Sequence, residues 1–188
     1  MFQRLAPGIF YHPNFIDPVK NSEILNEVHS WNDWSAAHAG RYKDDKLIET
    51  AEIKEIRDVL VNRKPLQSKT EEHLRIEEAA TQGNQLFGIE NVRASPYVVS
   101  KYVKDCHIRP HTDTDFFNTP RVYTGVYYLN SEYVGGEIYF PTFDISLRPE
   151  EGSLVLFLAE YLHGVMPIKS GERYSIVWFG EVERDKGH

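Results

Sequence analysis

The sequence has very little cysteine and lacks long apolar runs. Cys106 is the only cysteine among 188 residues, so an intramolecular disulfide is impossible, and we interpret Cys106 as a small buried apolar residue. A membrane-spanning helix needs roughly 18 consecutive apolar residues, and the chain contains no such run. Arg4 and Pro7 interrupt the N-terminal stretch where a signal peptide would need its apolar segment. We therefore expect a soluble, cytoplasmic protein without a membrane partner.

The sequence also has fewer basic than acidic residues. Lys and Arg number 21 against 28 Asp and Glu, which leaves a formal net charge of -7. This balance argues against a broad nucleic-acid or anionic-membrane surface and favours a metabolite or protein substrate. The chain is 41% hydrophobic and 13% aromatic, enough to bury one sizeable core. We predict a single domain over residues 1–188.

The hydrophobic pattern changes from helical to strand-like near residue 91. In the first half, residues 8–12 suit a strand and Asp17-Pro18 is typical of a helix start. Polar turns are expected at 40–45, and apolar spacing predicts helices at 46–61 and 70–87. Residues 1–90 are thus predicted to be a mostly helical support layer.

The second half has a period of two. Short β-branched and aromatic segments alternate with turn residues such as Gly135-Gly136 and Pro149. This pattern favours a mainly β jelly roll over residues 91–181. The predicted strands are 96–103, 122–129, 137–140, 145–147, 154–158 and 174–180.

Three residues in this half form a candidate metal site. His111 and Asp113 are two residues apart, so on a β-strand both side chains would point to one face. His163 follows after several predicted strands, which is enough chain to return to the same place. Two imidazoles and one carboxylate suit Fe(II) and leave open positions for substrate and oxygen. His107 and Asp115 also lie at even offsets from His111, but we favour the His-x-Asp pair over them.

A carboxylate-binding residue follows the last of these histidines. Arg173 lies ten residues after His163 and opens the last predicted strand. Its planar guanidinium can bind a carboxylate through two parallel hydrogen bonds. Ser175 is two residues further and shares the same strand face.

With these motifs in this order, the chain resembles the 2-oxoglutarate- and Fe(II)-dependent dioxygenases of the prolyl hydroxylase-like branch. The resemblance covers about residues 92–181 and is specific because several motifs occur in the family's order. The matching segments are His111-Thr112-Asp113, Tyr127 within VYYLN, Gly135-Gly136-Glu137-Ile138-Tyr139-Phe140-Pro141, His163-Gly164-Val165 and Arg173-Tyr174-Ser175.

The resemblance implies a fold, cofactors and residue roles. The fold would be a double-stranded β-helix, cupin-like and buttressed by N-terminal helices. Fe(II) would be bound by the two histidines and the aspartate, and O2 and 2-oxoglutarate would be co-substrates, with ascorbate as a reductant. Arg173 would bind the distal carboxylate of 2-oxoglutarate. Tyr127 and Ser175 would add hydroxyl groups, and Tyr102 would line the pocket.

The expected reaction is hydroxylation of an unactivated C–H bond with release of succinate and CO2. Residues 114–121 are predicted to form a lip of the pocket, and their two phenylalanines suit an apolar or proline-like group. A prolyl residue in a peptide or protein is the first choice of substrate by family analogy, and a free amino acid or small metabolite is the alternative. Two other classes stay open: a cupin metalloenzyme without keto acid, and an inactive binding module.

Overall fold

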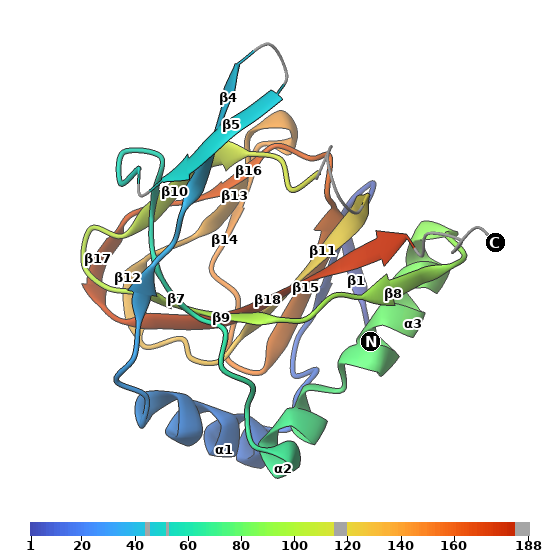
Figure 1. The fold of residues 1–188 in the computed structure, drawn as a ribbon. Helices are drawn as coiled ribbons and strands as arrows, with labels where there is room; N and C mark the ends of the chain where they lie inside the picture. The colour runs from blue at the N-terminus through green and yellow to red at the C-terminus, as the bar shows by residue number, and fades with distance from the viewer. Residues whose placement is uncertain (44–45, 52, 115–119, 183–188) are drawn as a thin grey trace, which may run out of the picture.

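A large and a small antiparallel sheet form the body of the chain. The computed structural model describes residues 1–43, 46–51, 53–114 and 120–182. Within them, the large sheet has nine strands in the order β1-β2-β15-β11-β18-β9-β7-β3, with β8 paired to β18. The small sheet has five, in the order β14-β13-β16-β10-β6, and lies across the body from the large one (Figure 1). This is the predicted mainly β, double-stranded β-helix.

The strands of the large sheet come from both halves of the chain. Their bounds are β1 Gln3–Ala6, β2 Ile9–His12, β3 Ser35–Ala36, β7 Leu60–Asn62, β8 Val92–Ala94, β9 Val98–Tyr102, β11 Arg121–Tyr128, β15 Ser153–Leu158 and β18 Arg173–Val182.

The small sheet and two hairpins complete the β structure. The small sheet contains β6 Arg57–Asp58, β10 His107–His111, β13 Ile138–Phe140, β14 Ile145–Leu147 and β16 His163–Val165, and a short 3-10 turn, η2 Pro141–Phe143, follows β13. The separate pairs are β12 Tyr133–Gly135 with β17 Ile168–Gly171, and β4 Ala39–Lys43 with β5 Lys46–Ala51. The β4–β5 hairpin projects from the end of the body where β10 and β16 lie (Figure 1).

Helices cover the outer face of the large sheet. They are α1 Pro18–His29, α2 Ser68–Glu71, the 3-10 turn η1 Glu72–Leu74 and α3 Ile76–Phe87. Asp17 caps α1, because its carboxylate accepts from the backbone N–H groups of Val19 at 3.0 Å and Lys20 at 3.4 Å. The predicted start of this helix and the helical prediction for 70–87 are both confirmed. No helix within the described part of the chain is long and apolar enough to cross a membrane.

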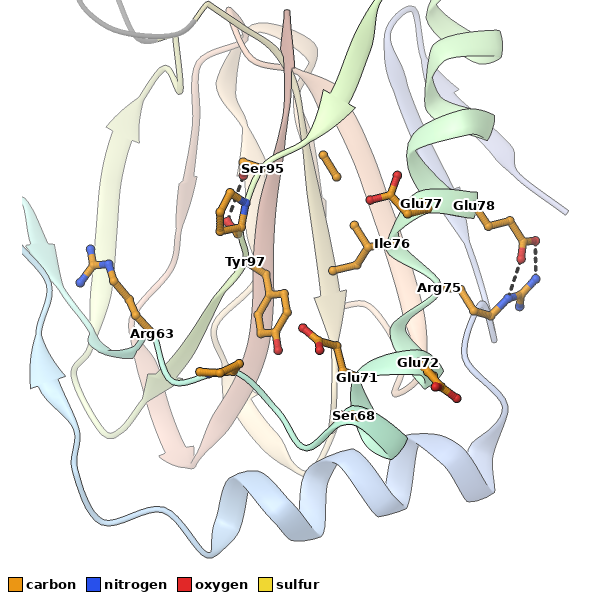
Figure 2. Close-up of a pocket in the computed structure, with 13 residues that line it drawn as sticks. Arg63, Ser68, Glu71, Glu72, Arg75, Ile76, Glu77, Glu78, Ser95 and Tyr97 are labelled. Atoms are coloured by element: carbon orange, nitrogen blue, oxygen red, sulfur yellow. Dashed lines mark hydrogen bonds and ion pairs between the residues drawn. The ribbon is translucent and has the colours of Figure 1, made fainter. Parts of the chain in front are cut away.

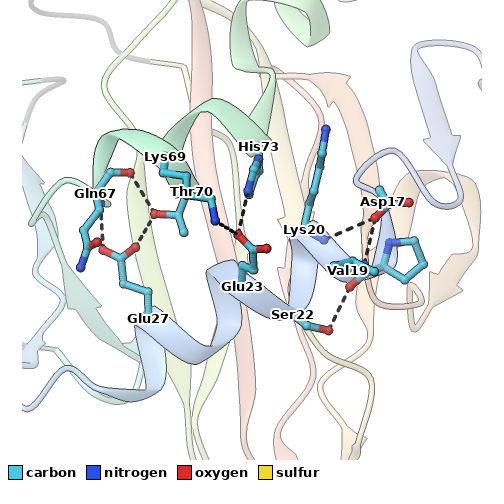
Figure 3. Close-up of polar contacts among 11 residues, drawn as sticks. Asp17, Val19, Lys20, Ser22, Glu23, Glu27, Gln67, Lys69, Thr70 and His73 are labelled. Carbon is cyan, nitrogen blue, oxygen red and sulfur yellow. Dashed lines mark hydrogen bonds and ion pairs between the residues drawn. The ribbon is translucent and has the colours of Figure 1, made fainter.

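Polar contacts join α1 to α2 (Figure 3). Glu27 on α1 accepts from the backbone N–H of Gln67 at 2.9 Å and from the hydroxyl of Thr70. Glu23, one turn earlier, contacts Lys69 at 3.2 Å and His73 at 3.1 Å. These contacts close the helical layer over the sheet.

Two predictions for the first half are wrong. Residues 46–61, predicted as a helix, contain β5, β6 and β7, and the turn predicted at 40–45 contains β4 up to Lys43, with 44–45 outside the described residues. Val59 and Val61 point into the inner core, and β7 pairs with β9. Sheet partners thus outweighed the helical spacing of the apolar residues. Residues 1–90 are consequently not a mostly helical layer, since β1, β2, β3 and β7 belong to the large sheet.

Side chains along β11 and β18 point alternately to the core under the helices and to the space between the two sheets. Tyr127 and Trp178 face outward into the core under the helices. Gly125 allows this packing, because a Cβ there would lie 2.3 Å from Trp178 Cε2. Tyr128 and Val126 instead face inward, toward the small sheet. Parity along these two strands therefore decides which side chains reach the space between the sheets.

Candidate active site

The structure brings His111, Asp113 and His163 together. Their potential ligand atoms all lie within 4.8 Å of one another. Asp113 Oδ1 is 3.3 Å from His111 Nε2, and Asp113 Oδ2 is 3.4 Å from His163 Nε2. His111 ends β10 and His163 starts β16, and the two are direct partners in this antiparallel pair.

Asp113 reaches the site differently from the sequence-based expectation. Strand β10 ends at His111, so strand parity does not orient Asp113. Its backbone N–H donates to the carbonyl of Ala159 at 2.8 Å, just beyond β15. Its Oδ2 accepts from the hydroxyl of Thr124 on β11 at 2.6 Å. The carbonyl of Ala159 and the hydroxyl of Thr124, both from the large-sheet side, thus orient Asp113, which follows the small-sheet strand β10.

Each histidine is held through its Nδ1. This atom lies 3.0 Å from the carbonyl of Arg109 in His111, and 3.0 Å from the carbonyl of Tyr161 in His163. A carbonyl only accepts, so Nδ1 must carry the proton, and in a neutral ring Nε2 keeps a free lone pair. A histidine that binds a metal through one ring nitrogen usually donates a hydrogen bond from the other, as Nδ1 does here.

The charge states suit a cation. Burial alone would raise the pKa of Asp113, but its contacts with His111, His163 and the hydroxyl of Thr124 outweigh burial and hold that pKa well below its usual range. Burial lowers the pKa of His163, and the charge of Asp113 only partly opposes this. At neutral pH the site therefore offers a carboxylate and neutral imidazole, the forms that bind a divalent metal.

An apolar wall protects one side of the site. The ring of Phe157 lies 4.5 Å from that of His163, and Phe140 lies 6.1 Å from it, both measured between centroids. Phe140 and Phe157 are fully buried. This wall excludes water from the buried histidine.

Arg173 supplies a buried positive charge on the inner face of the large sheet. It is 2% exposed and donates to the carbonyl of Gly136 at 3.1 Å, while its Nε has no hydrogen-bond partner. The rings of Tyr102 and Tyr128 lie 4.6 and 4.8 Å from the guanidinium. Among the described residues, no carboxylate lies within 4.0 Å of it. A buried cation without a counter-charge is costly, so this arrangement suits an anionic ligand.

Hydroxyl groups without partners surround this guanidinium. Tyr128, Tyr133 and Ser175 each have a buried hydroxyl without a hydrogen-bond partner among the described residues. Burial raises the pKa of both tyrosines, so both remain hydroxyl donors. Unsatisfied buried donors next to a guanidinium fit the carboxylate of a small dicarboxylic acid.

The structure corrects one predicted residue of this pocket. Tyr127 lies on the outer face of β11, where its ring packs 6.0 Å from that of Phe15 under the helices. The inward tyrosine is Tyr128, the direct partner of Ser175 on β18. Tyr102 and Ser175 do face the pocket, since Tyr102 pairs with Arg173. The sequence offered two adjacent tyrosines, and only the register of β11 against β18 separates them.

Sequence reasoning missed Thr124 and Tyr133 as well as Tyr128. Thr124 is four residues before Tyr128 on β11, so the two side chains point to the same face. Its inward position could therefore have been predicted if Tyr128 had been known to face inward. Tyr133 begins β12 and gave no comparable signal. His107 lies outside the triad, with its ring Nδ1 3.1 Å from the carbonyl of Asp105. Asp115 and most of the predicted lip at 114–121 lie outside the described residues.

Two cavities adjoin on the side of the chain near Pro96. One, of about 790 Å³, lies between the α2–α3 region and the start of β9, and Figure 2 shows glutamates around it. The other, of about 290 Å³, reaches the inner faces of β9 and β18. Arg63, Ser95 and Pro96 belong to the walls of both. Neither cavity contains a residue of the triad, and the second lies on the inner side of the large sheet.

Comparison with known families agrees with this geometry. Residues 97–180 match the model of the 2OG-Fe(II) oxygenase superfamily, and this segment contains the triad and Arg173. The match spans less than half of the chain and shows a similarity to that superfamily in the segment that contains the candidate site. A PKHD-type hydroxylase from Crocosphaera subtropica is 32% identical over 95 residues, a match that covers 46% of this chain and 43% of that protein's length.

Solved structures of prolyl hydroxylases resemble this chain in fold over most of its length. A prolyl-4-hydroxylase from Pseudomonas putida gives a TM-score of 0.71 at 19% identity, with 95% of each chain covered. A prolyl hydroxylase from Trichoplax adhaerens, in complex with a hypoxia inducible factor peptide fragment, gives 0.70 at 17% identity, covering 94% of this chain and 84% of that one. At these identities the likeness establishes the fold, including its N-terminal strands and helices.

Proposed function

We propose that this chain is an Fe(II)- and 2-oxoglutarate-dependent dioxygenase that hydroxylates an unactivated C–H bond. The observation that carries the proposal is the pairing of a His-Asp-His triad with a buried guanidinium that has no anionic partner. A metalloenzyme without a keto acid would have no need of this buried charge. The match to the 2OG-Fe(II) oxygenase superfamily supports the same conclusion.

The residues present fit both groups. His111 and His163 would bind Fe(II) through Nε2, and Asp113 through its carboxylate. Arg173, Tyr128 and Ser175 would bind the distal carboxylate of 2-oxoglutarate, which would satisfy their unpartnered atoms. When bound, the metal and the keto acid supply the oxidising chemistry from O2, with release of succinate and CO2.

The chain itself orients the reactants and keeps water out. Thr124 directs one oxygen of Asp113, and the backbone carbonyls of Arg109 and Tyr161 fix the histidine tautomers. Phe140 and Phe157 close the apolar side. A dry, preoriented site limits consumption of the keto acid without substrate oxidation. We propose ascorbate as the reductant that restores Fe(II) after such uncoupled turnover.

For the substrate, we propose a prolyl residue in a peptide or protein. One similar structure is a viral collagen prolyl hydroxylase, at 16% identity and a TM-score of 0.67, and another contains a bound peptide fragment. The inner cavity shares wall residues with the larger outer groove, so an extended chain could occupy both. A free amino acid or small metabolite would leave the outer groove empty.

The test combines 2-oxoglutarate turnover with product detection. Purified protein with Fe(II), ascorbate and 2-oxoglutarate is incubated with proline-containing peptides and with free amino acids, and succinate and a mass gain of one oxygen atom are measured. We expect succinate from the wild type, and oxidised product among the peptides. Product only among the free amino acids would replace the prolyl substrate by the small-molecule one.

Two variants test the residue roles in the same assay. His111→Ala should abolish both metal binding and turnover. Arg173→Ala should retain the metal and lose affinity for 2-oxoglutarate, because it removes the guanidinium that lies over the rings of Tyr102 and Tyr128. Absence of succinate from the metal-loaded wild type would refute the proposed function.

A further inference from the structure

The cavity of about 290 Å³ lies on the same inner face as the keto-acid pocket. Its wall includes Ser100 and Val98 on β9 and Val177 on β18. Ser100 is the direct partner of Ser175, and Val98 that of Val177. Because partners in a ladder share a face, this cavity continues from the pocket around Arg173 along the inner surface of the large sheet.

Two of its wall residues connect it to the metal triad. Phe179 is the partner of Thr124, which donates to Asp113. Arg57 pairs with Ile108 on β10, the strand that ends in His111. The cavity is therefore placed to hold the part of a substrate next to the oxidised carbon.

The wall of this cavity is rich in positive charge. It contains Arg57, Arg63 and Arg121, with His38 beside them and Glu181 as its one carboxylate. This concentration occurs in a chain whose formal charge is -7. The charge of the cavity wall is thus opposite in sign to the net charge of the chain, and a local positive potential of this kind attracts anions.

Two of these arginines have a buried Nε without an internal partner. Nε of Arg57 and Nε of Arg121 are buried without a hydrogen-bond partner. Arg121 lies 3.6 Å from Glu181 and stacks on Phe179 at 3.7 Å. Within the described residues, Arg57 and Arg63 form no ion pair within 4.0 Å. Buried donors without partners normally indicate a missing ligand.

We propose that the substrate carries an anionic group, a carboxylate or a phosphate, which Arg57, Arg63 and Arg121 bind next to the oxidised C–H bond. The inference rests on the proposed function and narrows its substrate class. Guanidinium groups recognise both anions through paired N–H donors. Combined with a prolyl substrate, it predicts a proline adjacent to an acidic or phosphorylated residue.

Direct binding tests this without requiring turnover. The full chain is loaded with Zn(II), which is redox-inactive, and saturated with 2-oxoglutarate so that Arg173 is occupied. Capped peptides with Glu, phosphoserine, Gln or Lys on either side of a proline are then titrated by calorimetry. We expect the Glu or phosphoserine peptides to bind at least about tenfold more tightly than the Gln peptides, as charge-assisted hydrogen bonds require.

Matched variants assign the effect to the cavity. Arg57→Gln should remove the preference for the anion, and Arg63→Glu should shift it toward Lys. Arg4→Gln is the control, because Arg4 is an exposed arginine on β1, outside both cavities. The Glu and phosphoserine arms distinguish a carboxylate from a phosphate, and N-acetylglutamate tests whether a free acid suffices.

Each outcome decides the proposal. Equal binding of all four peptide types, including no measurable binding by any of them, overturns it, as does a preference that survives in Arg57→Gln and Arg63→Glu. Succinate formation is measured separately on the Fe(II)-loaded wild type. A protein that forms succinate without an anion preference loses only this inference, and one that binds anions but forms no succinate loses the proposed function.

Discussion

Neighbouring tyrosines on β11 have opposite surroundings. Tyr127 and Tyr128 are both fully buried, and burial raises the pKa of both, so each keeps its proton. Tyr127 packs against Phe15 under the helices, whereas Tyr128 lies 4.8 Å from the guanidinium of Arg173. One step along the strand thus separates a residue packed under the helices from one that faces the guanidinium of Arg173.

Replacing each tyrosine by phenylalanine should separate these roles. Tyr128→Phe should weaken 2-oxoglutarate binding about tenfold or more, because it removes a hydrogen bond to a charged group. Tyr127→Phe should leave that affinity unchanged. Anaerobic titration of 2-oxoglutarate into the metal-loaded protein measures both. A weaker affinity in Tyr127→Phe, with Tyr128→Phe unaffected, would reverse the assignment made from the strand register.

Thr124 is expected to act through Asp113. Thr124→Val keeps the side-chain shape but removes the hydroxyl that donates to Oδ2, so metal affinity should fall about 10- to 100-fold. Thr124→Ser, which retains a hydroxyl, should stay close to the wild type. Competition between the protein and a metal-sensitive dye measures the affinities. If Val and Ser variants bind metal equally well, the hydroxyl does not position the carboxylate.

Among the elements, β11 and β18 pack tightly where Gly125 is the partner of Trp178. A Cβ at Gly125 would lie 2.3 Å from the indole, and Trp178 is fully buried in the cluster beneath the helices. The small residue therefore allows one wide ring to fill the outer core while the inner face of the same strand stays available for the site. Packing on one face of the sheet and chemistry on the other depend on the same ladder.

Gly125→Ala should lower the free energy of unfolding by about 1–3 kcal/mol, because overpacking displaces the indole. Gly88→Asn is the control: this residue ends α3 with φ +65° and has open space around its Cα, and Asn tolerates that conformation. Urea unfolding followed by Trp fluorescence measures both. A Gly125→Ala protein as stable as the wild type would mean that the indole can move at no cost.

Across the whole molecule, the site joins the two sheets. Asp113 accepts a hydrogen bond from Thr124 on the large sheet, and His163 pairs with His111 in the small sheet. Arg173 contacts Tyr102 on β9, Tyr128 on β11 and the carbonyl of Gly136. In the protein alone, two opposite charges lack a ligand between these layers: the carboxylate of Asp113 beside two imidazoles, which a divalent metal would complement, and the buried guanidinium of Arg173, which an anionic keto acid would complement. Ligands that neutralise them should therefore stabilise the entire fold.

Metal and keto acid should raise the melting temperature. A ligand at about 100 times its Kd adds about 2.7 kcal/mol, which corresponds to roughly 5–10 °C for a chain of this size. We expect Zn(II) with 2-oxoglutarate to give a shift of this order, and EDTA to remove it. His111→Ala should show no metal-dependent shift. Scanning calorimetry measures the transitions, and an equal shift in His111→Ala would place the stabilising metal elsewhere.

The second half of the chain was predictable because its strands carry local signals. Val122–Leu129 and Leu154–Leu158 are continuous β-branched and aromatic runs, and the observed strands β11 and β15 coincide with them within a residue. The helix prediction for residues 46–61 failed because apolar residues at helical spacing lie in β5, β7 and the segments on either side of β6, and β5, β6 and β7 are held by pairing with β4, β10 and β9. Short edge strands take their stability from partners distant in sequence.

Residue types and their order along the chain determined the chemistry of this protein: two imidazoles, one carboxylate and a guanidinium, with a resemblance that linked them to iron and a keto acid. Only the tertiary structure decided which tyrosine faces the guanidinium, that Thr124 orients Asp113, and that arginines from β6, β7's end and β11 converge on one cavity. The physical reason is that the ability to bind a metal or a carboxylate is a property of single side chains. Which side chains face the same pocket depends instead on strand register, which is set by pairing between distant segments.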